Sequence, residues 1–361
     1  MGRATVAAHQ RSFPRRRRPR AAPLNPRLCH PEEPAVLFYI LRRLASAISV
    51  VIVTLIASFA LFFLAPTDPA GVICGNRCTP ERIEAINDSL GLDEPAITQI
   101  GLYMKGIVVG RTYTTAGGVV TECPAPCLGY SYTLGQPVTK MLADALPVTL
   151  SIVLGGAIIY FGVGVAAGTL AAKSRGSTLD KVTVGTSLLV NSVPYFVVAL
   201  LVALYATVFP PAQYTPLLTN PWAWASGLLA AWVTLGLTNA ASYTRYSRAS
   251  MIETLGQDYI RTARSKGISE RRVVYRHGVR AGLTPVVTIL GLDVAFQLTN
   301  AIFTESIFGL PGLGLLSIRA FYQYDLPVLM GTVLLGSVVL VLMNLVVDIV
   351  YTFLDPRVRL G

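Results

Sequence analysis

Charged residues are scarce in this sequence. Only 14% of its 361 residues are Asp, Glu, Lys or Arg, whereas 53% are hydrophobic. A soluble domain of this size carries about one quarter charged residues. The shortage of charge therefore excludes an ordinary soluble enzyme and indicates a protein embedded in a membrane.

Motifs for nucleotide hydrolysis and nucleophilic catalysis are also lacking. The dipeptide Gly-Lys, which a phosphate-binding loop requires, never occurs. The three histidines, His9, His30 and His277, are scattered along the chain. We therefore predict no catalytic residue, no metal site and no cofactor in this chain. Any ATP hydrolysis that it depends on belongs to another polypeptide.

Long uncharged runs define the predicted architecture. A helix needs about 20 apolar residues to cross about 30 Å of hydrocarbon, and residues 44–65 form such a run without a charge. The longer run 182–244 is broken by prolines at 210, 211, 216 and 221. We predict an all-α polytopic membrane protein with six transmembrane helices, at about 44–65, 145–172, 182–208, 223–243, 284–303 and 328–354.

The distribution of Lys and Arg predicts the orientation. Six spans place both termini on one side, together with the loops 173–181 and 245–283, and that side carries 24 of the 30 basic residues. An excess of Lys and Arg is typical of the cytoplasmic side. We expect a multi-pass protein of the bacterial inner membrane with cytoplasmic termini. The net charge of +11 is explained by this topology, and no nucleic-acid partner is needed.

The chain divides into four predicted regions. Residues 1–35 form a basic, proline-rich tail that we expect to be disordered. Three explanations stay open for it: a solvated tail, which we favour over a tail that binds nucleic acid or anionic lipid, and sequence upstream of a true start near Val36 or Leu37. Residues 36–66 enter the membrane and cross it, 67–143 form a long extracytoplasmic loop, and 144–361 form a core of five spans with the cytoplasmic loop 245–283. The loop 67–143 should contain a helix that starts at Thr79 and ends at Gly91.

The extracytoplasmic loop holds four of the five cysteines, in two Cys-x3-Cys pairs. Outside the cytoplasm, paired cysteines favour disulfides, with three possible connectivities. A metal or cluster bound by four thiolates is the alternative. We favour disulfides because of the compartment. The candidates are Cys74, Cys78, Cys123 and Cys127.

Polar residues interrupt the fifth predicted span. Asp293, Gln297, Asn300 and Thr304 follow spacings of four, three and four residues, which place them on one helical face. A carboxylate in mid-membrane costs about 2.5–3.5 kcal/mol and should face protein or water. Two explanations stay open: this face lines a transport pathway, or it hydrogen-bonds neighbouring helices. The pathway candidates are Asp293, Gln297, Asn300 and Glu305.

A basic segment lies between the fourth and fifth spans. Residues 245–285 contain nine Lys or Arg against three Asp or Glu. Residues 258–266 can form a short helix, Gly267 allows a sharp turn, and Ser269 can cap a second helix. Tyr259 and Ile260 would offer apolar anchors to a partner, and the basic residues would offer charge pairs. A loop that only meets lipid headgroups is the alternative.

Several motifs follow one another in a fixed order along the chain: Leu90–Pro95, Leu128–Ser131, Leu146–Leu150, Tyr259–Gly267, Phe303–Gly314, Asp325–Pro327 and Asp355–Arg357. Together they resemble the membrane subunits of bacterial ABC importers of the dipeptide/oligopeptide/nickel permease family. The resemblance runs from about Phe38 to Leu360, and Arg261 replaces the Glu of the general coupling motif, as in the peptide branch.

The resemblance implies a type I ABC importer permease fold that forms half of a translocation pathway for di- or oligopeptides. It implies coupling to an ATPase through Tyr259, Arg261, Thr262, Ala263, Arg264, Lys266 and Gly267, and an extracytoplasmic gate segment with Phe308, Pro311, Gly312 and Gly314. It further implies four kinds of partner: a second homologous permease subunit, two cytoplasmic ATPases that hold ATP and Mg, a solute-binding protein outside, and the lipid bilayer.

Other functions are kept as alternatives. Nickel or another small solute is possible within the same family, although three histidines are few for nickel. Outside it, a stand-alone secondary transporter or channel would be expected to show inverted repeats, and a redox sensor would use the cysteines of the outer loop. Residues 112–126, which are inserted relative to the family pattern, leave the docking of a binding protein open.

Overall fold

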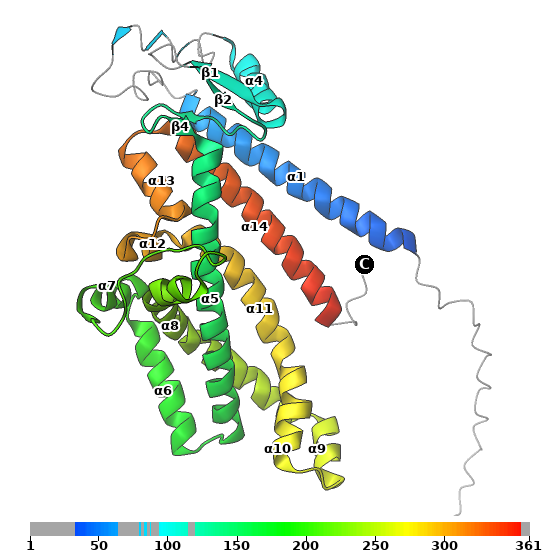
Figure 1. Ribbon diagram of the computed structural model, residues 1–361. Coiled ribbons are helices and arrows are strands. Elements are labelled where there is room, and N and C mark those ends of the chain that lie inside the picture. Colours follow the sequence, from blue (N-terminus) through cyan, green and yellow to red (C-terminus); the bar gives the residue numbers. More distant parts are fainter. Residues whose placement is uncertain are drawn as a thin grey trace, which may run out of the picture.

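Helices make up most of this protein. The computed structural model describes residues 33–63, 79, 80, 83, 84, 87, 94–114 and 120–354. Long helices run beside one another, and the strands gather at one end of the molecule (Figure 1). The first helix begins at Glu33, so the last three residues of the predicted tail are helical. The rest of that tail lies outside the described residues, as do Cys29 and the segment Asp355–Arg357.

The elements follow one another as α1 (Glu33–Phe63), α4 (Ala96–Val109), β1 (Arg111–Thr114), β2 (Val120–Cys123), β3 (Tyr130–Ser131), β4 (Gln136–Pro137), α5 (Val138–Lys173), α6 (Thr178–Ser192), α7 (Tyr195–Tyr205), α8 (Pro221–Leu255), α9 (Asp258–Ser265), α10 (Glu270–Arg272), the π-helix η3 (Val273–Gly278), α11 (Val279–Asn300), α12 (Ile302–Phe308), α13 (Leu313–Tyr322) and α14 (Leu326–Leu354).

The two longest helices, α5 and α8, pack along one another at the centre of the fold. Gly164 and Gly168 of α5 make this possible because they let the backbones approach closely. A Cβ at Gly164 would lie 2.3 Å from the Cβ of Tyr243, and one at Gly168 would lie 2.5 Å from the carbonyl oxygen of Thr244. Small residues four positions apart are typical of helix pairs that pack in a membrane.

Three helical runs among the described residues are long and apolar enough to cross a membrane: Val138–Lys173, Glu270–Asn300 and Leu326–Val347. A fourth is added if the bent pair α6 and α7 counts as one span. In α1 the apolar stretch Leu44–Ala60 is shorter than this requirement. The chain is therefore a mostly helical protein with membrane-spanning helices, and the number of six remains a prediction.

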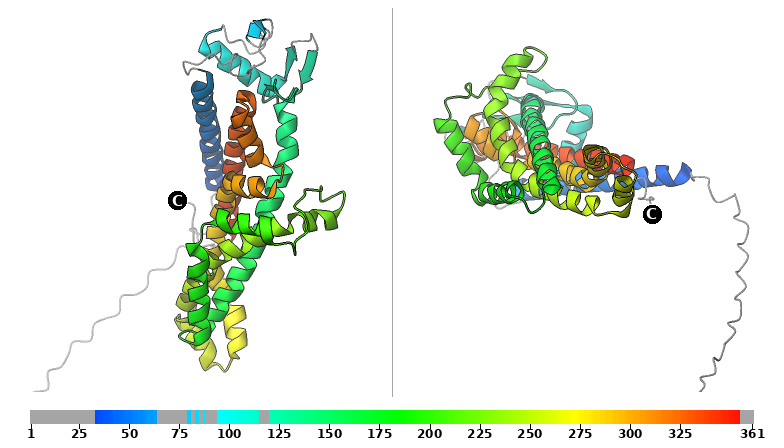
Figure 2. Two further views of the ribbon diagram at one scale, coloured as in Figure 1. Left: turned by 90° about the vertical axis from the view of Figure 1, so that its left-hand side faces the viewer. Right: turned by 90° about the horizontal axis from the view of Figure 1, so that it is seen from below.

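The third predicted span, over residues 182–208, is not one continuous helix. It consists of α6 and α7, which are bent by 86° at the break between them. Pro194 explains this break. A proline disfavours helical backbone at the preceding residue, and Val193 is extended, with φ −95° and ψ 126°. Figure 2 shows α7 and the segment that follows it projecting sideways from the long helices.

The strands form a small outer layer at the end opposite α9 (Figure 1). β1 pairs antiparallel with β2 so that Arg111 lies opposite Cys123, and β3 pairs with β4. Cys123 and Cys127 form a disulfide, which removes both thiolates as metal ligands. Cys74 and Cys78 lie outside the described residues. In the helix predicted from Thr79, the described positions Pro80, Ile83, Glu84 and Asn87 are helical.

Candidate functional site

The short helix α9 ends in a well-formed turn around Gly267. The amide of Gly267 donates to the carbonyl of Arg264 (2.9 Å), and the amide of Ile268 donates to the carbonyl of Ala263 (3.4 Å). Gly267 has φ +74°. These two bonds and the left-handed residue form a Schellman motif, in which glycine is favoured because it has no Cβ. The predicted helix and sharp turn therefore have a defined geometry.

Most residues of the predicted coupling motif lie on the surface. Tyr259 is 48% exposed, and Arg261, Thr262, Arg264, Lys266 and Gly267 are exposed as well, with Ala263 partly buried. Ile260 differs, because it is fully buried within this chain. The expectation that Ile260 is an apolar anchor for a partner is therefore wrong for this structure. The Ile260 side chain packs inside this chain, and burying such a side chain contributes about 1.5–3 kcal/mol to the stability of the fold.

An ion pair holds α9 against the start of the next helix. The guanidinium of Arg264 donates to both carboxylate oxygens of Glu270, at 3.1 Å and 2.8 Å. This proximity raises the pKa of Arg264 above its usual value. Ser269 stands at the N-cap position, but its side chain makes no capping hydrogen bond, contrary to the prediction. Arg264 is thus engaged within the chain, while Arg261 points more freely to solvent.

The base of α9 is tied to two long helices. α8 extends to Leu255 and the next helical run starts at Glu270, so most of the predicted loop 245–283 is helical. The hydroxyl of Ser250 donates to the carbonyl of Gly282 (2.6 Å). A Cβ at Gly282 would lie 2.8 Å from the sulfur of the fully buried Met251. These contacts pack α8 closely against α11 at the two ends of the segment that contains α9.

The polar residues of α11 have different surroundings. Asp293 accepts a hydrogen bond from the hydroxyl of Tyr243 in α8 (2.8 Å), and the ring of Tyr243 packs on that of Tyr160 in α5 at 4.7 Å between centroids. Gln297 is partly buried, and Asn300 donates to the carbonyl of Phe296 (2.9 Å). A carboxylate thus sits where three long helices meet and faces protein, as expected of an ionisable residue inside a membrane.

Glu305 does not fit the prediction that it lines a pathway, because it is fully buried in this conformation. Its carboxylate accepts hydrogen bonds from the hydroxyl of Thr149 (2.6 Å) and the amide of Leu315 (2.9 Å). The same hydroxyl accepts from the amide of Leu313 (2.9 Å). Glu305 and Thr149 together satisfy amides in the first turn of α13, where a negative charge is stabilising.

The glycines of the predicted gate segment are explained by this buried carboxylate. A Cβ at Gly312 would lie 2.2 Å from the carboxyl carbon of Glu305, and one at Gly314 would lie 2.4 Å from the Cα of Ile302. Phe308 is buried in a core that it shares with α8, and Pro311, just before α13, is exposed. The segment folds back on itself through α12 and α13 instead of forming an open loop.

A second buried carboxylate joins two other motifs. Asp325 is 1% exposed and accepts a hydrogen bond from the hydroxyl of Ser131. The amide of Val328, in the first turn of α14, lies 3.4 Å from the same carboxylate. Burial raises the pKa of Asp325 above its ordinary value, and the Ser131 hydrogen bond opposes that rise. Asp325 thereby connects the β3–β4 hairpin to the start of α14.

Sequence reasoning missed a cavity of about 920 Å³ between α5, α8 and residues 214–218. Its walls are mainly apolar and aromatic. The indoles of Trp224 and Trp232 are held by hydrogen bonds to Ser151, at 3.1 Å to its hydroxyl and 2.8 Å to its carbonyl. None of the four predicted pathway residues is among the described residues that line this cavity. Only the tryptophans, which are rare in this chain, could have pointed to it.

Comparison with known proteins identifies the family. The model of binding-protein-dependent transport system inner membrane components matches residues 164–360, and a model of the N-terminal part of such components matches 36–153. The chain belongs to this family. It is therefore an inner-membrane transport component, and the family is one of permease subunits and not of ATPases. The first match contains α9, Asp293 and the α12–α13 segment.

Individual relatives span nearly the whole chain. A Brucella abortus protein, named as a peptide transport system permease protein, is 38% identical over 324 residues, which is 89% of this chain and 98% of the relative. The dipeptide transport system permease protein DppB of Escherichia coli K12 is 34% identical over 353 residues, 90% of this chain and 99% of that protein. A solved structure of the MetNI methionine ABC transporter, in inward-facing conformations, aligns with a TM-score of 0.47 and 16% identity, over 60% of this chain and 97% of that one.

Proposed function

We propose that this inner-membrane component is a permease subunit of an ATP-driven importer of peptides, and that α9 is the element that docks on an ATPase. The observation that carries the proposal is α9 itself. Its exposed residues include Tyr259, Arg261 and Lys266, and the helix ends in the Gly267 turn. A short helix with a fixed attachment can pass a partner's movement into α8 and α11.

The proposed assembly contains a second homologous permease subunit, two ATPases that bind ATP and Mg, and an extracytoplasmic binding protein. Membership in a family of binding-protein-dependent transport components supports these partners. We place α9 in the cytoplasm because of the basic residues around it. The strands β1 to β4, at the opposite end, then lie outside. Both chain termini then lie in the cytoplasm.

Peptide is the substrate class that the relatives favour. Proteins from Brucella abortus and Escherichia coli, similar over about nine tenths of this chain, are named for peptide and dipeptide transport. We propose that Asp293, Gln297 and Asn300 line the pathway, with Asp293 able to pair with the ammonium group of a peptide. The partial exposure of these three side chains is consistent with a cavity that forms against the second permease subunit.

Uptake by intact cells tests this proposal. Cells that lack this gene and carry the remaining subunits should not accumulate a labelled dipeptide, and the wild-type gene should restore accumulation that requires ATP. A matched control replaces the peptide with labelled nickel, whose uptake should not change. Restored nickel uptake without peptide uptake would contradict the peptide assignment and leave the permease assignment standing.

A further inference from the structure

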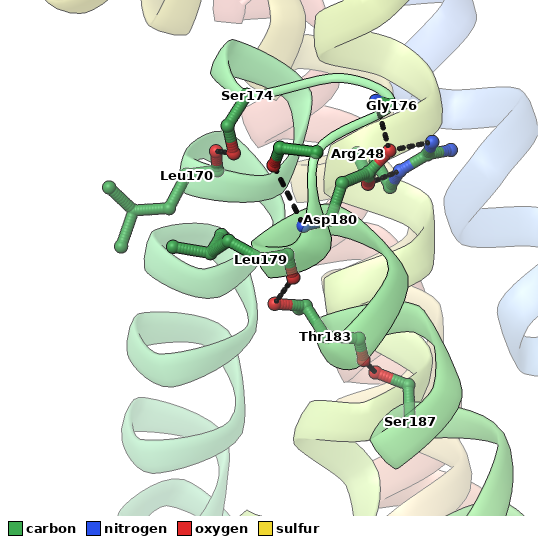
Figure 3. A network of polar contacts seen from close by, with 9 residues as sticks. Leu170, Ser174, Gly176, Leu179, Asp180, Thr183, Ser187 and Arg248 are labelled. Atoms are coloured by element: carbon green, nitrogen blue, oxygen red, sulfur yellow. Dashed lines mark hydrogen bonds and ion pairs between the residues drawn. The ribbon is translucent and has the colours of Figure 1, made fainter.

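A buried ion pair joins α6 to α8 near the attachment of α9. The guanidinium of Arg248 lies 2.5 Å and 2.8 Å from the two carboxylate oxygens of Asp180. The Asp180 side chain is only 5% exposed, and that of Arg248 is 27% exposed. The carboxylate also accepts from the amide of Gly176 (2.9 Å), which ties in the turn after α5 (Figure 3). The other two ion pairs among the described residues are much more exposed.

Arg248 lies within one turn of the residues that attach α9. Ser250 and Met251 follow it on α8 and contact Gly282 of α11. On the opposite side, a Cβ at Gly168 of α5 would lie 2.9 Å from the backbone nitrogen of Arg248. Helices α5, α6 and α11 therefore all contact one turn of α8. The chain continues from this turn to the end of α8 and then into α9.

Apart from this ion pair, few buried side chains fix the part of α6 near α9. Of the described residues of α6, only Asp180 and Ser187 are buried. The hydroxyl of Ser187 bonds within its own helix, to the carbonyl of Thr183. The next side-chain hydrogen bonds between α6 and α8 join Asn191 with Ser242 (3.0 Å) and with Arg245, at the far end of the helix. Among the side-chain hydrogen bonds of the described residues, the Asp180–Arg248 pair is thus the one that joins this end of α6 to α8.

At its far end, α6 leads to the buried carboxylate of Glu305. After the break at Pro194, the hydroxyl of Tyr195 in α7 is 2.7 Å from that of Thr304 in α12. Thr304 precedes Glu305, which binds the first turn of α13. The pair α6–α7 therefore extends from the attachment of α9 to the α12–α13 segment, which Figure 1 shows higher in the bundle.

We propose that α6 and α7 form a mechanical link between the attachment of α9 and the α12–α13 segment, and that the ion pair between Asp180 and Arg248 is the contact that drives it. This inference rests on the proposed function. A bidentate pair fixes both distance and orientation, so a displacement of α8 by α9 must carry the start of α6 with it. Tyr195 then passes the displacement to Thr304 and to the Glu305 segment. Asp180 and Arg248 are positioning residues, since neither needs to touch the transported solute.

The test measures ATP hydrolysis and peptide uptake together. The complete complex, with both permeases, both ATPases and the binding protein, is reconstituted in liposomes. Asp180→Asn or Arg248→Gln should lower the amount of peptide imported per ATP hydrolysed about tenfold or more, a typical size for coupling between sites. Lys181→Gln, which removes an exposed charge beside the pair, is the matched control and should leave this ratio unchanged.

The double variant distinguishes transmission from separate effects. Because both residues act through one contact, Asp180→Asn combined with Arg248→Gln should lower the ratio no further than either single change. Losses that multiply would overturn the proposal. So would a parallel fall of hydrolysis and uptake at a constant ratio, which is the result of a purely structural role. A wild-type complex without ATP-driven peptide uptake would instead refute the proposed function, and the link with it.

Discussion

Single residues fix the conformation at several points of this chain. Gly267 adopts a φ that side chains with a Cβ rarely take, and Gly312 leaves room for the carboxylate of Glu305. Glu305 and Asp325 are carboxylates buried against amides in the first turns of α13 and α14. Each can be tested alone because its neighbours are known.

Substitution of Gly267 tests the turn after α9. In Gly267→Ala the added methyl group would meet no neighbouring atom within 4 Å, but the left-handed φ would be strained. The turn conformation should therefore be destabilised by about 1 kcal/mol. We expect α9 to fray and ATP-driven peptide uptake to fall several-fold. Gly256→Ala is the matched control, because Gly256 lies just before α9 with φ −83° and ordinary contacts. Equal uptake by the two variants would refute a role for the turn.

Substitution of Gly312 tests the buried carboxylate. Gly312→Ala forces a methyl group against Glu305, and overpacking of this kind costs about 1–3 kcal/mol. The midpoint of thermal unfolding of the purified chain in detergent should therefore fall. Gly162→Ala, in the middle of α5 with no atom within 4 Å, should leave the midpoint equal or higher. A Gly312→Ala variant as stable as the wild type would mean that Glu305 is not held as described.

The pKa of Asp325 predicts a pH dependence of stability. A carboxyl whose folded pKa is raised favours the folded state most at low pH, below its unfolded pKa near 3.8. Its contribution then declines as pH rises through the folded pKa. In Asp325→Asn this decline should be missing from the thermal midpoint measured from pH 4 upward. A wild type and variant with parallel pH curves would show that burial does not raise this pKa.

Among the elements, α9 shows both the reach and the limit of sequence reasoning. The predicted helix over 258–266 and the turn at Gly267 agree with α9 at Asp258–Ser265 and with its Schellman turn. The burial of Ile260 was missed because a short exposed motif says nothing about which side faces its own protein. The break between α6 and α7 was missed because Pro194 stands within a long run that contains no charged residue.

Two neighbouring residues of α9 should respond differently to truncation. Ile260→Ala removes a fully buried side chain, at a cost of about 2–4 kcal/mol, and should speed hydrogen exchange of the α9 amides. Tyr259→Ala removes a half-exposed ring and should leave exchange unchanged while weakening ATPase binding. Exchange rates of α9 measured by mass spectrometry check both. Faster exchange in Tyr259→Ala alone would reverse the assigned roles.

At the scale of the whole molecule, composition was sufficient for the membrane class, and ordered motifs were sufficient for the family. The pairings between these motifs could not be predicted, because the partners are far apart in the chain. Thr149 meets Glu305 across 156 residues, and Ser131 meets Asp325 across 194. Such contacts depend on how α5, α12, α13 and α14 pack, which no local pattern encodes. They make one framework of segments that the sequence presents as separate motifs.

The central claim is that an ATPase docks on α9. Retention of the ATPase subunits by the affinity-purified chain measures this most directly. Tyr259→Asp, on the exposed face of α9, should reduce the retained ATPase at least about tenfold, as loss of an aromatic contact at the centre of an interface does. Lys105→Asp, in α4 at the end of the molecule that carries the strands, should retain as much ATPase as the wild type. Full retention by the Tyr259→Asp chain would contradict the account.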